Sequence, residues 1–90
     1  MAILIDTPMW PNHGTLWSHL ISDTSLTELH DFARAHDVPP RAFDLDHYDV
    51  PQRRHDELVA DGATPVTGHE LVIRLRASGL RITAAQRRRR

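Results

Sequence analysis

Histidine and aspartate recur in this sequence at spacings that suit metal binding. His47 and Asp49 lie two residues apart in the stretch FDLDHYDV, residues 43–50, where apolar and acidic residues alternate. Residues two apart on a strand point to the same side and lie about 6.5 Å apart along the chain, so both side chains can reach one ion. His19 and Asp23 share a face if their strand persists for four residues. We therefore predict that these groups gather at one place.

His30 is a further candidate ligand, because it stands on the apolar stripe of a predicted helix between Leu29 and Ala33. A side chain on that stripe faces the sheet and not water. Imidazole nitrogens and carboxylate oxygens are ligands of zinc, manganese and ferrous iron. The sequence thus predicts a divalent-metal site, and its expected ligands are His19, His30, His47 and Asp49.

Asp6 and Asp23 are the candidate catalytic groups, each as a further ligand or as the base that manages a proton beside a metal-activated water. Asp6 directly follows the apolar run Ile3-Leu4-Ile5. No spacing matches H-E-x-x-H or another standard metal signature. A structural alternative therefore stays open, in which the histidines are hydrogen-bonded core residues and Asp49 only fixes the tautomer of His47.

Composition excludes several other kinds of chemistry. The 90 residues contain no cysteine, which rules out disulfides, thiol catalysis and cysteine-bound zinc. No glycine-rich phosphate loop or nucleophile elbow is present, so we expect no nucleotide cofactor and no serine hydrolase. The first residues lack a basic region, and their apolar run is too short for a signal peptide or a membrane span. We expect a cytoplasmic protein with no membrane partner.

Charge is distributed unevenly along the chain. All 12 acids and four arginines lie in residues 1–71, whereas residues 72–90 hold seven arginines and no acid. The run Arg87–Arg90 could contact nucleic-acid phosphates or an acidic partner. Its simpler interpretation is a basic disordered tail over residues 83–90.

Strand and helix signals alternate along residues 1–82, which we interpret as a single domain. Two capping boxes, Ser25 to Glu28 and Thr67 to Glu70, each open a predicted helix, and these helices end near His36 and Gly79. Besides these, the pattern predicts strands at 2–6, 16–22 and 63–66 and a helix at 52–61. We therefore predict an α/β domain of two or three layers, with a three- to four-stranded, mostly parallel sheet and about three helices. Sites in such sheets lie at the carboxyl ends of the strands.

Trp10 and Trp17 flank a loop that contains Pro11 and Gly14. These rings could stack on bases or line a pocket. Tryptophans in such a place more often close over a small core or bury at a subunit contact. A homo-oligomer is therefore one possible assembly.

Several short pieces of the chain, taken in order, resemble a known family. They are Ile-Leu-Ile-Asp6, Trp17-Ser18-His19-Leu20, Asp23-Thr24, Glu28-Leu29-His30, His47-Tyr48-Asp49, Gly62-Ala63 and Thr67 to Leu71. As a set they resemble the small bacterial and phage family known as domain of unknown function 4031, over roughly residues 2–82. The phage members open with a strand followed by Asp-Asp, whereas this chain has Asp6-Thr7. A nuclease site centred on Asp6 is correspondingly doubtful.

The resemblance implies no activity, but it does imply that six residues form one constellation: His19, Asp23, His30, His47, Tyr48 and Asp49. Two function classes follow from the sequence. The first is a metal-dependent hydrolase that acts on a phosphoester or nucleic acid. The second is a non-catalytic interaction or oligomerisation module that contains a structural His/Asp cluster. Nucleic-acid binding without catalysis is a third possibility, although the acidic body disfavours a large duplex footprint.

Overall fold

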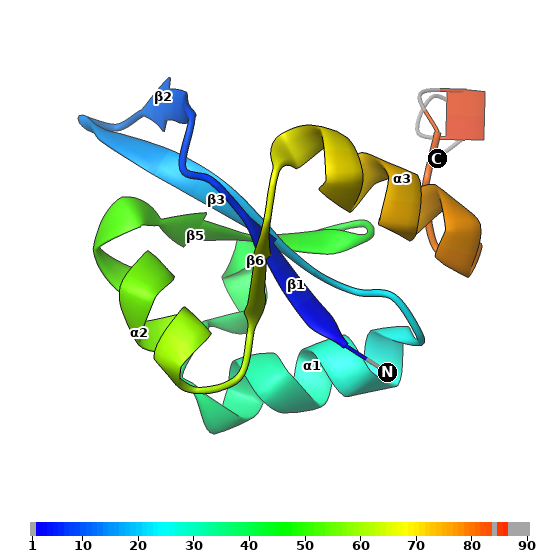
Figure 1. The fold of residues 1–90 in the computed structure, drawn as a ribbon, viewed down its shortest axis with the longest axis horizontal. Coiled ribbons are helices and arrows are strands. Elements are labelled where there is room, and N and C mark those ends of the chain that lie inside the picture. The colour runs from blue at the N-terminus through cyan, green and yellow to red at the C-terminus, as the bar shows by residue number, and fades with distance from the viewer. Residues whose placement is uncertain (1, 84, 87–90) are drawn as a thin grey trace.

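The computed structural model describes residues 2–83 and 85–86. Its strands and helices follow each other in mixed order (Figure 1). The strands are β1 (Ile3–Asp6), β2 (Trp10–Asn12), β3 (Thr15–Ser22), β4 (Phe43–Asp44), β5 (His47–Pro51) and β6 (Thr64–Val66). The α-helices are α1 (Leu26–Ala35), α2 (His55–Ala60) and α3 (Gly68–Ser78), and short 3₁₀ turns cover Pro40–Ala42 and Gln52–Arg54.

The six strands form one mixed sheet in the order β4-β5-β3-β1-β6, with β2 paired to β3 outside this path. β1 and β6 are parallel, and every other pair is antiparallel. The α/β class and three helices are as predicted, but the prediction of a mostly parallel sheet of three to four strands was wrong. The physical reason lies in the turns. The segment taken for a loop contains β2, and His13 and Gly14, with φ of 48° and 77°, make the two-residue hairpin turn into β3.

A second tight turn divides the stretch FDLDHYDV. β4 pairs antiparallel with β5, with Phe43 opposite Tyr48 and Asp44 opposite His47. Leu45 and Asp46 therefore form the tip of the β4–β5 hairpin. Leu45 has a φ of 61°, a strained value for a bulky residue. The single strand that the alternating pattern predicted is therefore a hairpin.

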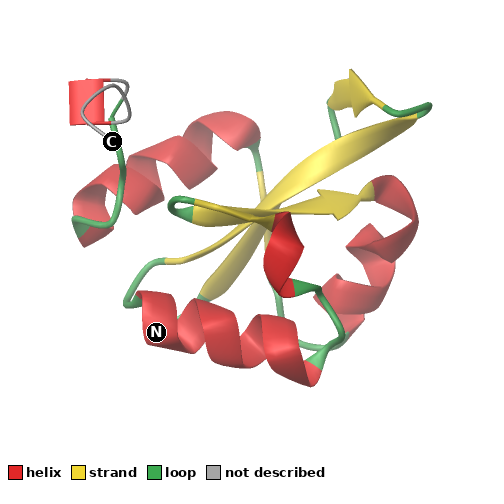
Figure 2. Ribbon diagram, turned by 180° about the vertical axis from the view of Figure 1, so that it is seen from behind, coloured by secondary structure: helices red, strands yellow, loops and turns green. Residues whose placement is uncertain are grey.

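Helices cover both faces of the sheet, which gives three layers (Figures 1 and 2). On one face, α1 and α2 bury Leu29 and Leu58 against side chains such as Ile5 and Leu20. On the other face, α3 places Leu71 and Leu75 against a smaller apolar cluster that includes Leu4 and Ile21. Alternation along the strands thus sends odd-numbered residues of β3 and β5 to the side of α3 and even-numbered ones to the side of α1 and α2.

The predicted helix signals act as N-caps. Ser25 Oγ accepts the backbone N–H of Glu28 at 3.1 Å, and Thr67 Oγ1 accepts that of Glu70 at 3.1 Å. Gly79 ends α3 in the left-handed conformation, with a φ of 82°. Glu28 does not complete its box, because its carboxylate instead accepts the hydroxyl of Ser22. This contact ties α1 to the end of β3.

The segment after α3 returns to the sheet and lies against the β4–β5 hairpin, where the backbone N–H of Ile82 donates to Asp46 at 2.8 Å. Residues 81 and 82 are therefore part of the fold. The predicted tail contact, Arg87–Arg90, lies outside the described residues. Within the described ranges, no helix has the length and apolar character needed to cross a membrane.

Candidate metal centre

His19, His47 and Asp49 come together on the face of the sheet that α3 covers. His19 of β3 and Asp49 of β5 are register partners, and His47 precedes Asp49 by two residues on the same side. One ligand atom from each of the three lies within 4.8 Å of the others. The two imidazole rings meet edge to face, with their centroids 5.0 Å apart. We refer to these three residues as the ligand cluster.

Asp6 orients His19 through both of its carboxylate oxygens. Oδ2 lies 2.8 Å from His19 Nδ1, and Oδ1 accepts the backbone N–H of the same residue at 2.6 Å. Asp6 is only 5% exposed, so burial fixes the carboxylate in place. With Nδ1 donating to Asp6, the other ring nitrogen, Nε2, is left as the acceptor in the neutral tautomer.

Asp46 holds His47 in the same way. Its Oδ1 lies 2.7 Å from His47 Nδ1, and its Oδ2 accepts the backbone N–H of Ile82. Arg81 lies 3.6 Å from the same Oδ2, and Asp46 is 1% exposed. A buried charge of this kind is stable only when it is paired and hydrogen-bonded, and these contacts meet that need. Both histidines thus have Nδ1 bound to a buried carboxylate, as metal-ligating histidines commonly do.

Asp49 completes the cluster with an oxygen that lacks a well-formed hydrogen bond. Its Oδ1 lies 3.1 Å from His47 Nε2, which is close enough for an ion pair. The oxygen is buried, however, and makes no aligned hydrogen bond to any described residue. A buried carboxylate oxygen in this condition calls for a cation or a proton.

Burial opposes the positive charge of His47, but its contacts with Asp49 and Asp46 outweigh burial and raise its pKa above the ordinary 6.5. The two carboxylates therefore make protonation of His47 easier than that of an ordinary imidazole. A cation held between the imidazole nitrogens and the Asp49 carboxylate would balance the same negative charges.

Access to the cluster comes from its outer side. The side chains of His19 and Asp49 are 34% and 28% exposed, whereas that of His47 is 11% exposed. A cavity of about 350 Å³ lies against Asp6 and both histidines, and α3 and Arg81 form its other wall. Water or a small ligand in this cavity can thus reach both histidines, whereas Asp49 lines a neighbouring cavity.

His30 does not join the ligand cluster. Its Nδ1 lies 2.6 Å from the hydroxyl of Tyr48, and its ring packs edge to face on Phe43 at 4.7 Å. Tyr48 lies between His47 and Asp49 in the chain and so points to the opposite face of the sheet. The sheet therefore separates His30 from the three residues with which we predicted it to act. Burial raises the pKa of Tyr48 and keeps its hydroxyl neutral as a hydrogen-bonding group.

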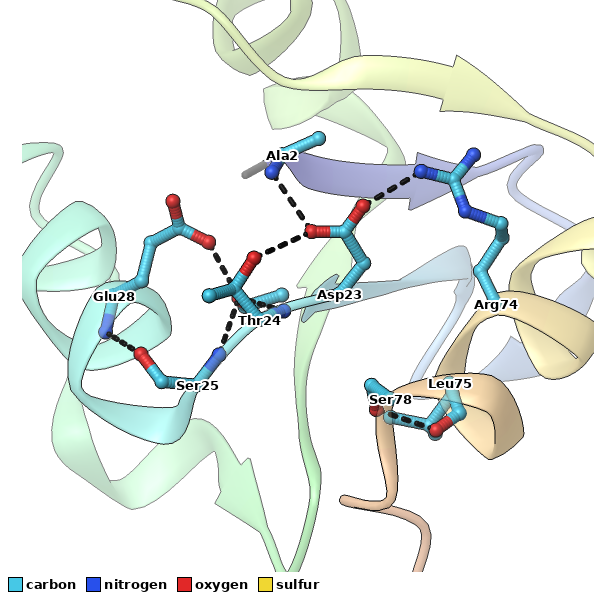
Figure 3. A network of polar contacts seen from close by, with 9 residues as sticks. Ala2, Asp23, Thr24, Ser25, Glu28, Arg74, Leu75 and Ser78 are labelled. Atoms are coloured by element: carbon cyan, nitrogen blue, oxygen red, sulfur yellow. Dashed lines mark hydrogen bonds and ion pairs between the residues drawn. The ribbon is translucent and has the colours of Figure 1, made fainter.

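Asp23 belongs to a network of contacts of its own, which Figure 3 shows. Its Oδ1 accepts the backbone N–H of Ala2 at 2.8 Å and the hydroxyl of Thr24, and its Oδ2 accepts Arg74 at 2.6 Å. These contacts, led by the bond from Ala2, lower the pKa of Asp23 to about 2. Both of its oxygens serve to join the start of β1, the end of β3 and helix α3. We call this group of four residues the Asp23 network.

Asp46 is the residue that sequence reasoning missed, because it is not among the predicted ligands or catalytic groups. The hairpin tip turns Asp46 inward, next to His47. An acid directly before a candidate histidine was a visible signal. The left-handed conformation of Leu45, which decides the direction, has no glycine or asparagine to announce it.

Fold and site together define a small three-layer α/β domain with a mixed sheet and a two-histidine, one-carboxylate cluster on the face under α3. Residues 3–78 match the family described as Protein of unknown function (DUF4031), and the chain belongs to that family. No curated protein and no solved structure gave a significant match.

Proposed function

We propose that the ligand cluster binds one divalent metal ion and that the domain is a metal-dependent hydrolase acting on a phosphoester or nucleic acid. The observation that supports this most strongly is the pair of buried carboxylates, Asp6 and Asp46. Each holds the Nδ1 of one histidine and so leaves Nε2 available beside Asp49. One hydrogen bond at Nδ1 is enough to hold a structural core histidine. Two histidines that are both held in this way beside the same carboxylate, Asp49, have the arrangement expected of metal ligands.

The donor atoms fit zinc, manganese or ferrous iron. Ligand atoms that share such an ion at about 2.1 Å lie roughly 3.0–3.5 Å from one another. The three donors lie within 4.8 Å of each other, so side-chain shifts on the order of 1 Å would close the set. Asp49, whose side chain is 28% exposed, can make such a shift, while Asp6 and Asp46 hold the two histidines in place.

Three protein ligands leave open positions for water and substrate, and the bound ion lowers the pKa of that water toward neutrality. Asp6 does not serve as the base that we considered from the sequence, since both of its oxygens are committed to His19. Its role is to position His19. Asp23 takes no part, because the Asp23 network uses its carboxylate elsewhere.

Metal binding is tested on untagged protein that has been stripped with a chelator and titrated calorimetrically with Zn²⁺ and Mn²⁺. We expect one ion per chain, with binding lost in His19→Ala and His47→Ala. His30→Ala is the matched control, because His30 was predicted as a ligand from the sequence but lies outside the ligand cluster in the structure. We expect this variant to bind one ion per chain. An equal loss of metal binding in all three variants, or no metal uptake by the native protein, would refute the metal site.

Hydrolysis is tested separately on the metal-loaded protein with bis(p-nitrophenyl) phosphate and a single-stranded oligonucleotide. We expect turnover that disappears in His47→Ala and survives in His30→Ala. Metal uptake without turnover of either substrate would contradict the proposed hydrolase activity and would indicate that the ion is structural.

The raised pKa of His47 favours one alternative, in which a proton takes the place of the metal. A protonated His47 would then bridge Asp46 and Asp49 as a structural cluster, and the domain would serve as a non-catalytic interaction or oligomerisation module. Absence of metal uptake together with a concentration-dependent mass in sedimentation equilibrium would favour it. In either case we propose a cytoplasmic location, on the ground that the chain contains no cysteine.

A further inference from the structure

A larger groove lies next to the ligand cluster and shares Asp49 with it. This cavity has a volume of about 600 Å³, and its lining includes Trp10, Trp17, Arg41 and Arg53. Its volume falls within the range of about 300–1,000 Å³ that ligand sites occupy. Because Asp49 belongs to both places, a molecule in the groove would lie beside the proposed ion.

One wall of the groove is a stack of aromatic rings. Trp10 and Trp17 are register partners on β2 and β3, with ring centroids 5.8 Å apart and planes within 23°. The ring of Trp10 lies the same distance from that of His19, so the stack runs from the groove to the cluster. Trp17 Nε1 donates to the backbone carbonyl of Asn12 at 2.8 Å, which fixes the orientation of the indole. The wall is therefore a preformed stacking platform, not a flexible pair of rings.

The lining of the groove also carries positive charge that the fold does not use. Arg41 and Arg53 are exposed and form no ion pair with any residue in the described ranges. Arg54 serves the fold instead, because its guanidinium donates to the carbonyls of His36 and Asp37 and pairs with Glu57. A pocket that combines uncommitted arginines with ordered indoles fits a ligand that is anionic at one end and flat and aromatic at the other.

We propose that this groove binds a single strand of nucleic acid, with a base on the Trp17 face and phosphates on Arg41 and Arg53. The proposal rests on the proposed function and names its substrate. Trp17 and Pro51 are register partners, as are His19 and Asp49 two residues away on the same two strands. That separation is about 6.5 Å. A strand seated on the indoles would thus present a phosphodiester to the ligand cluster.

A duplex fits this surface poorly. Bases in a duplex are stacked on each other and cannot lie on an indole, whereas single strands offer their faces. The body of the protein also carries an excess of acids over residues 1–71, which repels a wide phosphate footprint. Two exposed arginines in one groove suit a short stretch of one strand.

The test measures fluorescence anisotropy of end-labelled dT12 and U12 in EDTA, so that neither metal uptake nor cleavage affects the result. All proteins are full-length and carry Ser in place of Arg87–Arg90, which removes binding by that basic run. Arg41→Ala and Arg53→Ala are compared with Arg76→Ala, an exposed arginine on α3 that does not line the groove. Trp17→Ala is compared with Trp17→Phe, which keeps an aromatic face. Circular dichroism checks the fold of every variant.

We expect Arg41→Ala and Arg53→Ala each to weaken binding about three- to tenfold and to reduce the slope of log affinity against log salt by about 0.7. Trp17→Ala should weaken binding roughly tenfold, with most of it restored in Trp17→Phe. A 12-base-pair duplex should compete at least tenfold less well. The proposal is overturned if neither oligonucleotide binds, or if Arg76→Ala weakens binding as much as the groove variants do.

The two proposals fail separately. Oligonucleotide binding in EDTA without metal uptake would refute the metal centre and support the groove. Metal uptake without oligonucleotide binding would leave the metal centre standing and refute the groove as a nucleic-acid site.

Discussion

The ligand cluster and the Asp23 network are both built on buried or half-buried carboxylates, yet they differ in what they leave unused. In the Asp23 network, both oxygens accept hydrogen bonds from groups of the chain itself (Figure 3). Next to the ligand cluster, Asp6 and Asp46 are equally committed, but within the cluster His19 Nε2 finds no hydrogen-bond partner among the described residues and Asp49 Oδ1 lacks an aligned one. A count of acids therefore does not locate a site. A site is located by ligand atoms that have no hydrogen-bond partner of their own but belong to side chains that hydrogen-bonded neighbours hold in place.

The largest effect expected from this difference is on metal affinity. His47→Ala removes a ligand from the centre and should lower Zn²⁺ affinity by more than 100-fold, since loss of a supporting contact alone costs about 10- to 100-fold. Asp23→Asn, in the other region, should leave the affinity within about twofold of the native value, because no ligand depends on it. Calorimetric titration of both variants decides the matter, and a comparable loss in Asp23→Asn would erase the distinction.

A second variant asks whether Asp6 positions His19 or only fills space. Asp6→Asn keeps the size of the side chain but weakens its hold on Nδ1, so Zn²⁺ affinity should fall about 10- to 100-fold with the stoichiometry unchanged. A mere packing role predicts lower stability and normal affinity. Titration combined with thermal unfolding separates these outcomes.

The Asp23 network should show its effect in stability and in its pH dependence. The folded pKa of about 2 lies below the ordinary 3.8, so the charged carboxylate stabilises the fold above about pH 4, and this contribution is lost as pH falls through 2. Asp23→Asn should therefore lower the free energy of unfolding by about 1–2 kcal/mol at pH 7, with the difference shrinking toward pH 2. Urea titrations at pH 7, 4 and 2.5 measure it. A deficit that does not change with pH would mean that the carboxylate charge contributes nothing.

The smallest effect is expected across the sheet from the cluster. Tyr48→Phe removes the hydroxyl that contacts His30 and should cost about 0.5–1.5 kcal/mol of stability. Metal affinity should stay unchanged, because Tyr48 and the ligands lie on opposite faces. A change in Zn²⁺ affinity would show that the two faces are coupled.

Local signals in the sequence predicted much of the secondary structure. Ser25 and Thr67 cap their helices where expected, and the strand predicted at 16–22 is confirmed within β3. Period-two spacing also placed His47 and Asp49 on one side, because side-chain direction on a strand depends only on adjacent residues. The prediction that His19 lies near them stood on the expectation that strand ends meet at one edge. His19 does lie close to His47 and Asp49, but the reason is the antiparallel register of β3 and β5 and not the meeting of parallel strand ends.

The errors arise where direction depends on contacts distant in sequence. His30 was taken for a ligand because an apolar stripe shows that a residue faces the sheet but not which face of the sheet it meets. Asp46 was missed because its inward direction depends on a positive φ at Leu45, and a hydrogen bond to its carboxylate comes from Ile82, which is distant in sequence.

The sequence by itself determined the helices, the caps of α1 and α3, the strands β1, β3 and β6, and the placement of His47 and Asp49 on one side of a strand, since these depend on neighbours within a few residues. Only the tertiary structure decided that β3 and β5 run antiparallel, that His19 meets Asp49 while His30 lies behind the sheet, and that Asp46 is buried against Ile82. Each of those outcomes depends on how separate segments pack. Burial in that packing makes each carboxylate find a partner and leaves the ligand cluster with atoms still to be bound.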